Sequence, residues 1–300
     1  MPASSNSPHP GATRTPPLPR ICIVTPSFNQ GQFLRHTIES VLEQAYPALD
    51  YLVIDGGSTD DSVSVIRQYE SRLTFWCSEP DGGQAAALNT GFARSQAEIL
   101  GWVNSDDLLL PGALSAVAEY FAAHPDEEWL VGGCITIDSL NTRVRGRFGI
   151  RPGFNRGSRV TFRKLLIYGC DFNQPSVFWR RSAHLAVGQF DTSLRFSFDR
   201  EFFLRLAKRK PSGRIPQPLS CFRLHSAAKS TTMRQTKHED DAAIGRQYRL
   251  QEMFALSMHT LRLGLRAIDL ATQVNDNLAL LLHRISLPST PSGPDAGVRM

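Results

Sequence analysis

The sequence predicts an α/β fold with a mostly parallel sheet in its first half, and three observations support this prediction. Short apolar runs of strand length recur along that half of the chain. Segments with the spacing of amphipathic helices separate them, which favours parallel strands joined by right-handed crossovers. Each run ends abruptly in polar or acidic residues, as strands do where they leave a sheet. The expected strands are 21–24, 51–54, 73–77 and 99–103.

The first two strands are bounded by clear stop signals. The first is broken at residues 25–27, and the helical pattern of residues 33–42 follows. We expect Pro47 to end this helix because proline cannot continue the hydrogen-bond ladder. The second strand stops at Asp55, which opens a short glycine-rich turn.

The remaining elements of this half follow the same rhythm. Asp60 and Asp61 are expected in the first turn of the next helix, where the helix dipole favours negative charge. Apolar residues 85–88 begin a helix after the third strand. The fourth strand ends in two acids, and residues 113–123 carry the pattern of another helix.

The polar residues at the strand ends should meet at one edge of the sheet, where open α/β sheets bind ligands. The adjacent carboxylates of Asp106 and Asp107 repel each other unless a cation lies beside them, and a divalent metal bound to a diphosphate would supply it. The alternative is a solvated turn in which Asp107 caps the next helix. The chain lacks glycine-rich phosphate loops, so a diphosphate would be held through a metal. The residues expected at this edge are Thr25, Ser27, Asp55, Asp81, Asp106 and Asp107.

Composition is typical of a soluble globular protein. Of the 300 residues, 41% are hydrophobic and 20% charged, and the net charge is +5. This excess suits phosphate-bearing ligands or an anionic membrane surface, and it is too small to indicate a nucleic-acid partner. The five cysteines are widely spaced without a C-x-x-C pair, which is typical of reduced thiols. No uncharged apolar run reaches transmembrane length, so we expect a cytoplasmic protein.

Five motifs, in this order and spacing, resemble the inverting glycosyltransferases of family 2, which have the GT-A fold. The resemblance covers roughly residues 20–230 and is closest in kind to bacterial exopolysaccharide and O-antigen transferases. It implies a nucleotide-diphosphate sugar as the donor and Mg²⁺ or Mn²⁺ as the cofactor. The motifs are TPSFN at 25–29, IESVLEQ at 38–44, VIDGGSTD at 53–60, SEPDGGQ at 78–84 and NSDD at 104–107.

The resemblance also implies a role for each residue of the expected edge. Asp107 would ligate the metal, and Asp106 would reach the ribose or the metal. Asn104 stands where a first acid of this motif is common, which leaves the two adjacent acids as the metal pair. The residues expected to face the nucleotide base are Thr25, Ser27 and Asp55, with Asp81 beside it.

The second half resembles the acceptor-binding part of that family. Residues 173–179 resemble its acceptor-side strand, and residues 188–191 resemble the turn that follows. Asp199 leads a helical pattern and matches the family's general base, with Glu201 as the alternative. Outside that context, Asp199 would be ordinary negative charge at a helix N-terminus. The resemblance brings His225 to the metal or the diphosphate; the alternative is a satisfied surface or core histidine.

These patterns divide the chain into a catalytic domain, 20–235, and flanking segments. Within the domain, a nucleotide-sugar-binding half at 20–133 precedes an acceptor half at 134–235, because the strand–helix rhythm becomes irregular there. The flanking segments are disordered tails at 1–19 and 287–300 and a helical extension at 236–286.

Two features outside the motifs leave alternatives open. Between Ser139 and Cys170 the chain carries eight basic residues and no acid. That segment fits a solvated basic face, an anion site for a phosphorylated acceptor such as a lipid-linked pyrophosphate sugar, or contact with acidic headgroups. The apolar stripe of residues 242–285 fits packing on the catalytic domain, pairing with a second subunit as a homo-oligomer, or peripheral contact with the inner face of the membrane.

The leading functional hypothesis is a metal-dependent inverting glycosyltransferase. It would move a sugar from a nucleotide-diphosphate donor to a glycan or lipid-linked acceptor in surface polysaccharide biosynthesis. One alternative is a non-catalytic sugar-nucleotide-binding partner subunit of a glycan-assembly complex, which the intact acids Asp106, Asp107 and Asp199 disfavour. A second is a nucleotidyltransferase, which would need a basic glycine-rich loop near the first strand.

Overall fold

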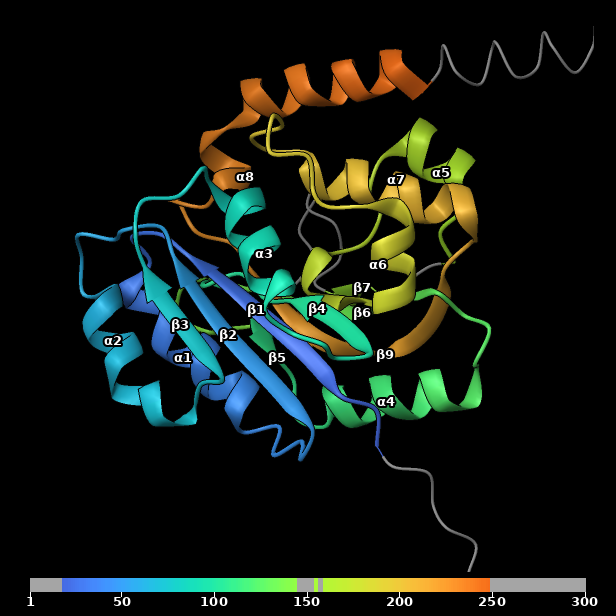
Figure 1. The fold of residues 1–300 in the computed structure, drawn as a ribbon. Coiled ribbons are helices and arrows are strands. Elements are labelled where there is room, and N and C mark those ends of the chain that lie inside the picture. Colours follow the sequence, from blue (N-terminus) through green and yellow to red (C-terminus); the bar gives the residue numbers. More distant parts are fainter. Residues whose placement is uncertain (1–17, 145–153, 156–158, 249–300) are drawn as a thin grey trace, which may run out of the picture. The chain divides into compact units, whose positions relative to one another are not determined.

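The computed structural model describes residues 18–144, 154–155 and 159–248. The chain divides into two compact units, Met1–Ile244 and Gly245–Met300, and the fold described below is that of the first. Its described strands form a single mixed sheet in the order β3-β2-β1-β4-β8-β6-β9-β5, with β7 paired to β6 (Figure 1). These strands are β1 (Ile21–Ser27), β2 (Leu49–Asp55), β3 (Phe75–Ser78), β4 (Ile99–Trp102), β5 (Leu108–Leu109), β6 (Trp129–Ile137), β7 (Phe154–Asn155), β8 (Val177–Arg180) and β9 (Gly213–Arg223).

The first half of the sheet is parallel, as the sequence predicts. β1 pairs with β2 on one side and with β4 on the other, and β3 joins the far edge of β2, all in parallel. The chain therefore changes direction across the sheet between β1 and β4, and ligands bind at such a switch point in open α/β sheets. Every residue of β1 and β4 is buried, which explains their unbroken apolar runs.

Helices cover both faces of the sheet, with α1, α2 and α4 on one side and α3, α6 and α7 on the other (Figure 1). The apolar spacing of α1 turns Phe33, Leu34, Ile38 and Val41 into the core. The helices are α1 (Gly31–Leu42), α2 (Ser62–Tyr69), α3 (Gln84–Ala93), α4 (Ala113–Ala123), α5 (Phe162–Tyr168), α6 (Arg181–Val187), α7 (Phe198–Arg209) and α8 (Lys229–Thr232), with 3-10 turns at Glu70–Arg72 and Gln174–Ser176.

The differences from prediction lie at element ends. α1 stops at Leu42, before Pro47, and Ala45 adopts a left-handed φ of 46° in the turn that follows. Asp60 precedes α2 instead of lying in its first turn. Its carboxylate accepts hydrogen bonds from the backbone N–H of Ser62 and of Gly31, both at 2.9 Å, and so ties the starts of α2 and α1 together.

The second half of the sheet is mixed, which confirms the predicted change of rhythm. β8 runs antiparallel between β4 and β6, whereas β9 runs parallel to β6. The predicted boundary at 133/134 falls inside β6, so the two halves share a continuous sheet. An aromatic cluster packs α7 onto this region, with the Trp102 ring 5.8 Å from Phe203 and 5.5 Å from Trp179.

A further helix occupies residues 234–248 and crosses the predicted domain boundary at 235/236. No helix of the described residues is long and apolar enough to span a bilayer. Residues 1–17 and 249–300 lie outside the described residues, and so do most of the two predicted tails and most of the helical extension. The same holds for four residues of the basic segment, Arg145, Arg147, Arg151 and Arg156.

Candidate active site

A cavity of about 810 Å³ opens where β1 and β4 end, at the switch point of the sheet. The loops after β1, β2, β3 and β4 form one part of its wall, and the start of α7 and the loop after β9 form the rest. Among the predicted site residues, those that line it are Ser27, Asp81, Asp106 and Asp199. Residues from both halves of the sheet therefore meet around one space.

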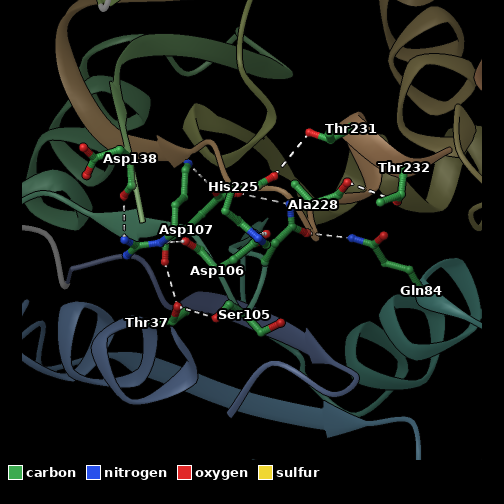
Figure 2. A network of polar contacts seen from close by, with 12 residues as sticks. Thr37, Gln84, Ser105, Asp106, Asp107, Asp138, His225, Ala228, Thr231 and Thr232 are labelled. Atoms are coloured by element: carbon green, nitrogen blue, oxygen red, sulfur yellow. Dashed lines mark hydrogen bonds and ion pairs between the residues drawn. The ribbon is translucent and has the colours of Figure 1, made fainter. Parts of the chain in front are cut away.

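Asp106 on this wall forms a pair with His225, which does not itself line the cavity. The Asp106 Oδ2 atom lies 2.9 Å from His225 Nε2, although 119 residues separate the two in the chain (Figure 2). The His225 ring also packs on Phe33, with 4.6 Å between the centroids. His225 is thus held on the loop after β9 by a ring contact and a carboxylate, with its side chain 5% exposed. This placement fits the alternative of a satisfied core histidine, and its approach to the metal stays a prediction.

This pair fits a divalent metal that arrives together with a diphosphate. Asp106 supplies a carboxylate and His225 an imidazole, both ligand types that Mn²⁺ accepts. In the described part of the chain, no group of three or more His, Cys, Asp or Glu side chains gathers into a complete ligand set. Metals of this kind commonly take one or two protein ligands and complete their shell with substrate phosphates and water.

Asp107, which the resemblance makes a metal ligand, does not line the cavity. Its side chain is buried, and its carboxylate accepts hydrogen bonds from the backbone N–H of Arg223 at 2.9 Å and from Asn104 Nδ2 at 3.1 Å. Burial raises the pKa of Asp107 well above its usual range, and the neighbouring charge of Asp106 raises it further. Asp107 therefore joins the end of β9 to the loop after β4.

A polar chain extends from Asn104 across the cavity wall to Lys229, a residue to which the sequence assigns no role. Gln84 Nε2 donates to Asn104 Oδ1 at 2.7 Å, and Lys229 Nζ donates to Gln84 Oε1 at 3.0 Å. Burial lowers the pKa of the Lys229 ammonium. The opposing influence comes from the carboxylates of Asp81, Asp106 and Asp199. Lys229, the first residue of α8, thus brings a cation to an acidic cavity, and sequence spacing could not indicate this contact.

Two of the residues predicted to face the nucleotide base are buried behind the cavity wall. The Asp55 carboxylate accepts hydrogen bonds from Ser58 Oγ at 2.6 Å and from Ser78 Oγ at 2.7 Å, so it ties together the loops after β2 and β3. The Thr25 hydroxyl lies 3.1 Å from the Tyr51 hydroxyl. In this structure both residues support the wall and neither forms it.

Of the residues predicted at the nucleotide base, those that line the cavity are Ser27 and Asp81. The buried Ser27 Oγ has no hydrogen-bond partner among the described residues. A Cβ atom at Gly56 would lie 3.2 Å from Asp81 Oδ1, so glycine at this position lets the Asp81 carboxylate lie against the loop after β2. Trp102 Nε1 is likewise buried and without a partner among the described residues, and Trp102 also lines the cavity. Unpaired polar atoms at a cavity wall fit a polar ligand.

Asp199 lies in the first turn of α7 and lines the cavity. Its carboxylate accepts a hydrogen bond from the backbone N–H of Arg200 at 2.7 Å. Burial raises the pKa of Asp199 to about 6, and the charge of Asp241 adds to the rise. The alternative base, Glu201, does not line the cavity. It is buried, and both its carboxylate oxygens bind the Arg205 guanidinium at 2.8–3.0 Å.

The part of the chain that matches a known protein family includes several residues of this site. The model of glycosyl transferase family 2 matches residues 22–184, more than half of the chain. The chain belongs to glycosyl transferase family 2. This confirms the predicted family and, at that level, the predicted enzyme class. The match includes the loops after β1 to β4 that carry Ser27, Asp81 and Asp106.

Family 2 relatives include several proteins named for glycan synthesis. An uncharacterized glycosyltransferase of Mycobacterium tuberculosis is 31% identical over 194 residues, which cover 63% of this chain and 69% of the relative. The O-antigen biosynthesis protein RfbC of Myxococcus xanthus is 29% identical over 223 residues, 71% of this chain and 16% of that protein. A putative teichuronic acid biosynthesis glycosyltransferase of Bacillus subtilis, TuaG, is 32% identical over 92 residues, 30% of this chain and 36% of that protein.

Solved structures show that the fold is the GT-A fold of family 2 transferases, as predicted. Staphylococcus aureus TarS in complex with UDP-GlcNAc aligns with a TM-score of 0.56 at 16% identity, over 70% of this chain and 60% of that one. The mannosyltransferase PcManGT of Pyrobaculum calidifontis, in complex with GDP-Man and Mn²⁺, aligns with a TM-score of 0.53 at 19% identity, over 70% of this chain and 58% of that one. The chain thus spans about three fifths of the length of these two structures.

Proposed function

We propose that this family 2 member is a metal-dependent inverting glycosyltransferase. It transfers a sugar from a nucleotide-diphosphate donor to a hydroxyl of a glycan or lipid-linked acceptor, in the synthesis of a surface polysaccharide. The observation that carries the proposal is that Asp106, from the loop after β4, and Asp199, from the start of α7, line one cavity, while His225 pairs with Asp106 at 2.9 Å. The names of two relatives, the O-antigen biosynthesis protein RfbC and the putative teichuronic acid biosynthesis glycosyltransferase TuaG, support the choice of surface polysaccharide.

Donor binding uses the end of the cavity formed by the loops after β1 to β4. Ser27 Oγ and the Asp81 carboxylate are available to the nucleotide, Asp106 and Lys229 are available to its diphosphate, and His225 pairs with Asp106. When bound there by Asp106 and His225, Mg²⁺ or Mn²⁺ would neutralise the charge of the departing diphosphate. The Lys229 ammonium adds a second positive charge, close to where that negative charge develops.

Acceptor activation is the task of Asp199. With a pKa of about 6, this carboxylate is deprotonated at neutral pH and remains basic enough to take a proton from the acceptor hydroxyl. The hydroxyl oxygen then forms the new bond to the anomeric carbon, while the bond from that carbon to the diphosphate oxygen breaks. Attack from the side opposite the leaving group inverts the anomeric configuration.

Thermal shift and turnover assays on the full-length protein test this proposal. We expect uridine or guanosine diphosphate to raise the melting temperature only when Mn²⁺ or Mg²⁺ is present, because ligands stabilise the state that binds them. The matching nucleotide sugar should then be hydrolysed slowly to the nucleoside diphosphate, and chelation should stop the release. Binding without any turnover would instead indicate the non-catalytic partner subunit. Turnover that survives chelation would contradict the metal dependence. The cytoplasmic location and a homo-oligomer through the helical extension stay predictions.

A further inference from the structure

The short helix α5 (Phe162–Tyr168) presents an unusual outer face. Leu165 and Leu166 are buried beneath the helix, whereas Ile167 is 62% exposed and Tyr168 is 76% exposed. Arg163 and Lys164 are also exposed, one turn earlier on the same side. We call Arg163, Lys164, Ile167 and Tyr168 the α5 face. Two cations and two large apolar side chains therefore share one exposed face of a single helix.

The stability of the fold explains neither the two exposed apolar side chains nor the two exposed cations of the α5 face. Large apolar side chains at the surface in contiguous positions are characteristic of interaction sites, whereas single exposed ones are ordinary. The two charged residues of the α5 face itself are both basic, and the sequence segment 139–170 that contains it has eight basic residues and no acid. A protein partner would need an acidic, apolar surface of its own. An anionic bilayer offers both properties, since its headgroups attract lysine and arginine while its interface accepts tyrosine and aliphatic side chains.

The position of α5 relative to the cavity indicates a function for the α5 face. Arg200 Nη2 donates to the backbone carbonyls of Leu166 at 3.1 Å and of Leu165 at 3.4 Å. Arg200 follows Asp199 directly on α7, and α5 lies beside the start of α7 (Figure 1). The last turn of α5 is thus attached to the residue next to the proposed base, on the acceptor side of the cavity.

We propose that the α5 face docks this protein onto an anionic lipid surface, so that the cavity receives a lipid-linked acceptor held in that surface. The acceptor class rests on the function proposed above, whereas the docking itself does not. Two cations and two inserted side chains give weak, reversible and salt-sensitive attachment. Such attachment suits an enzyme that releases one lipid-linked product and takes up the next acceptor.

Vesicle sedimentation with the full-length protein tests the docking without using catalysis. The probes are vesicles of phosphatidylcholine alone and of phosphatidylcholine with phosphatidylglycerol, at low and high salt. We expect wild type to bind the phosphatidylglycerol vesicles at low salt and to leave them at high salt. Inorganic phosphate at millimolar concentration should not compete, which separates a lipid surface from a site for a free phosphate group.

Two double variants and their matched controls locate the surface. Arg163→Gln with Lys164→Gln should weaken vesicle partitioning by roughly 25-fold, at roughly fivefold per charge. Ile167→Ser with Tyr168→Ser should weaken it by roughly tenfold or more. The charge control is Arg67→Gln with Arg72→Gln, exposed positions on α2 and the turn that follows it, and the apolar control is Leu185→Ser, 68% exposed on α6. Both controls should bind as wild type does, and all variants should keep the wild-type melting temperature.

Two different results would overturn the docking proposal. If the α5 variants bind vesicles as tightly as wild type, the attachment belongs to another part of the chain and the proposal is overturned. The second result is that the wild-type protein does not bind vesicles but forms a dimer that Ile167→Ser with Tyr168→Ser dissociates. That result would assign the α5 face to contact with a second copy of this chain, and it would also overturn the proposal. Metal-dependent binding of a nucleoside diphosphate should be unchanged in every one of these variants. If the wild-type protein did not bind a nucleoside diphosphate in the presence of metal, that result would contradict the proposed function but not the docking.

Discussion

The carboxylate of Asp240 accepts a hydrogen bond from the backbone N–H of Ser197 at 3.0 Å, at the residue that precedes the first turn of α7. The same oxygen accepts from the backbone N–H of Phe196 at 2.8 Å. Beside it, Asp241 accepts from Ser197 Oγ at 2.8 Å and pairs with Arg200 at 2.9 Å. The helix at 234–248 therefore holds the start of the helix that carries the proposed base. A truncation at the predicted domain boundary, 235/236, would remove both carboxylates.

Asp241→Asn should extend activity to lower pH. Asp199 must be deprotonated to act as a base, so transfer falls as the pH drops through its pKa of about 6. The negative charge of Asp241 helps to raise that pKa, and its removal also leaves the Arg200 charge uncompensated. The midpoint of the acidic limb of kcat should therefore move down by roughly one pH unit or less.

Lys237→Gln is the matched control because Lys237 has the opposite influence. Its positive charge lowers the pKa of Asp199, so its removal should move the acidic limb of kcat to higher pH. Steady-state kcat between pH 4.5 and 8.5 measures both variants. Shifts in the same direction, or none in either variant, would indicate that another group controls the limb.

Asp199→Asn should stabilise the fold above pH 6 while it removes activity. The folded-state pKa of Asp199, about 6, lies above its ordinary value of 3.8, so the folded state disfavours the charged form. The resulting loss of stability is absent below about pH 4 and is complete above pH 6, and it amounts to at most about 3 kcal/mol. Asparagine has no charge to bury and still accepts the hydrogen bond from Arg200.

Denaturant unfolding at pH 8 and at pH 4 measures this difference. We expect the variant to unfold at higher denaturant than wild type at pH 8 and at nearly the same concentration at pH 4. An equal gain at both pH values would attribute the effect to packing, and a loss at pH 8 would contradict the raised pKa.

Asp106 and Asp107 should respond to substitution in opposite ways. Asp106→Ala keeps the backbone contacts of the loop but removes the carboxylate that lines the cavity and pairs with His225, so it should abolish metal-dependent nucleotide binding in a folded protein. Asp107→Ala leaves the buried Arg223 N–H without its acceptor, at a cost of roughly 1–3 kcal/mol, and removes one of the two acceptors of Asn104 Nδ2. It should therefore act first on stability.

Titration calorimetry with a nucleoside diphosphate and Mn²⁺, alongside thermal unfolding, separates the two acids. Asp107→Asn supplies the milder control because its amide oxygen keeps one acceptor. If Asp107→Ala folded with wild-type stability and lost metal-dependent binding, the metal would have to lie at Asp107 after all.

The contrast between Asp106 and Asp107 shows which features of the site cannot be predicted from the sequence. Strand and helix positions follow from local periodicity, and α4 spans its predicted residues, Ala113–Ala123. The meeting of polar strand ends at one edge follows from parallel pairing. However, which of two adjacent carboxylates turns inward depends on Arg223, 116 residues later in the chain. The contact of Lys229 with Gln84 spans 145 residues and leaves no local pattern.

The family resemblance leaves Asp199 and Glu201 as candidates for the general base, and their positions in the structure separate them. Asp199 lines the cavity, whereas Glu201 is buried against Arg205. Asp199→Asn should reduce transfer by about 10²–10⁴-fold, as loss of a general base commonly does, while the dissociation constant of the donor stays unchanged. Asparagine preserves the shape and the accepted hydrogen bond but cannot take a proton from the acceptor.

Glu201→Gln is the matched control, since it removes the same charge two residues away on the same helix. It weakens a charge-assisted pair that Arg205 makes at 2.8 Å, and should lower the melting temperature while the folded fraction retains near-normal kcat. Steady-state transfer and donor affinity, measured for wild type and both variants, decide the assignment. A dead Glu201→Gln beside an active Asp199→Asn would transfer the role of base to Glu201. Full activity in both would mean that the acceptor proton leaves by another route, because no carboxylate at the start of α7 would then be needed to remove it.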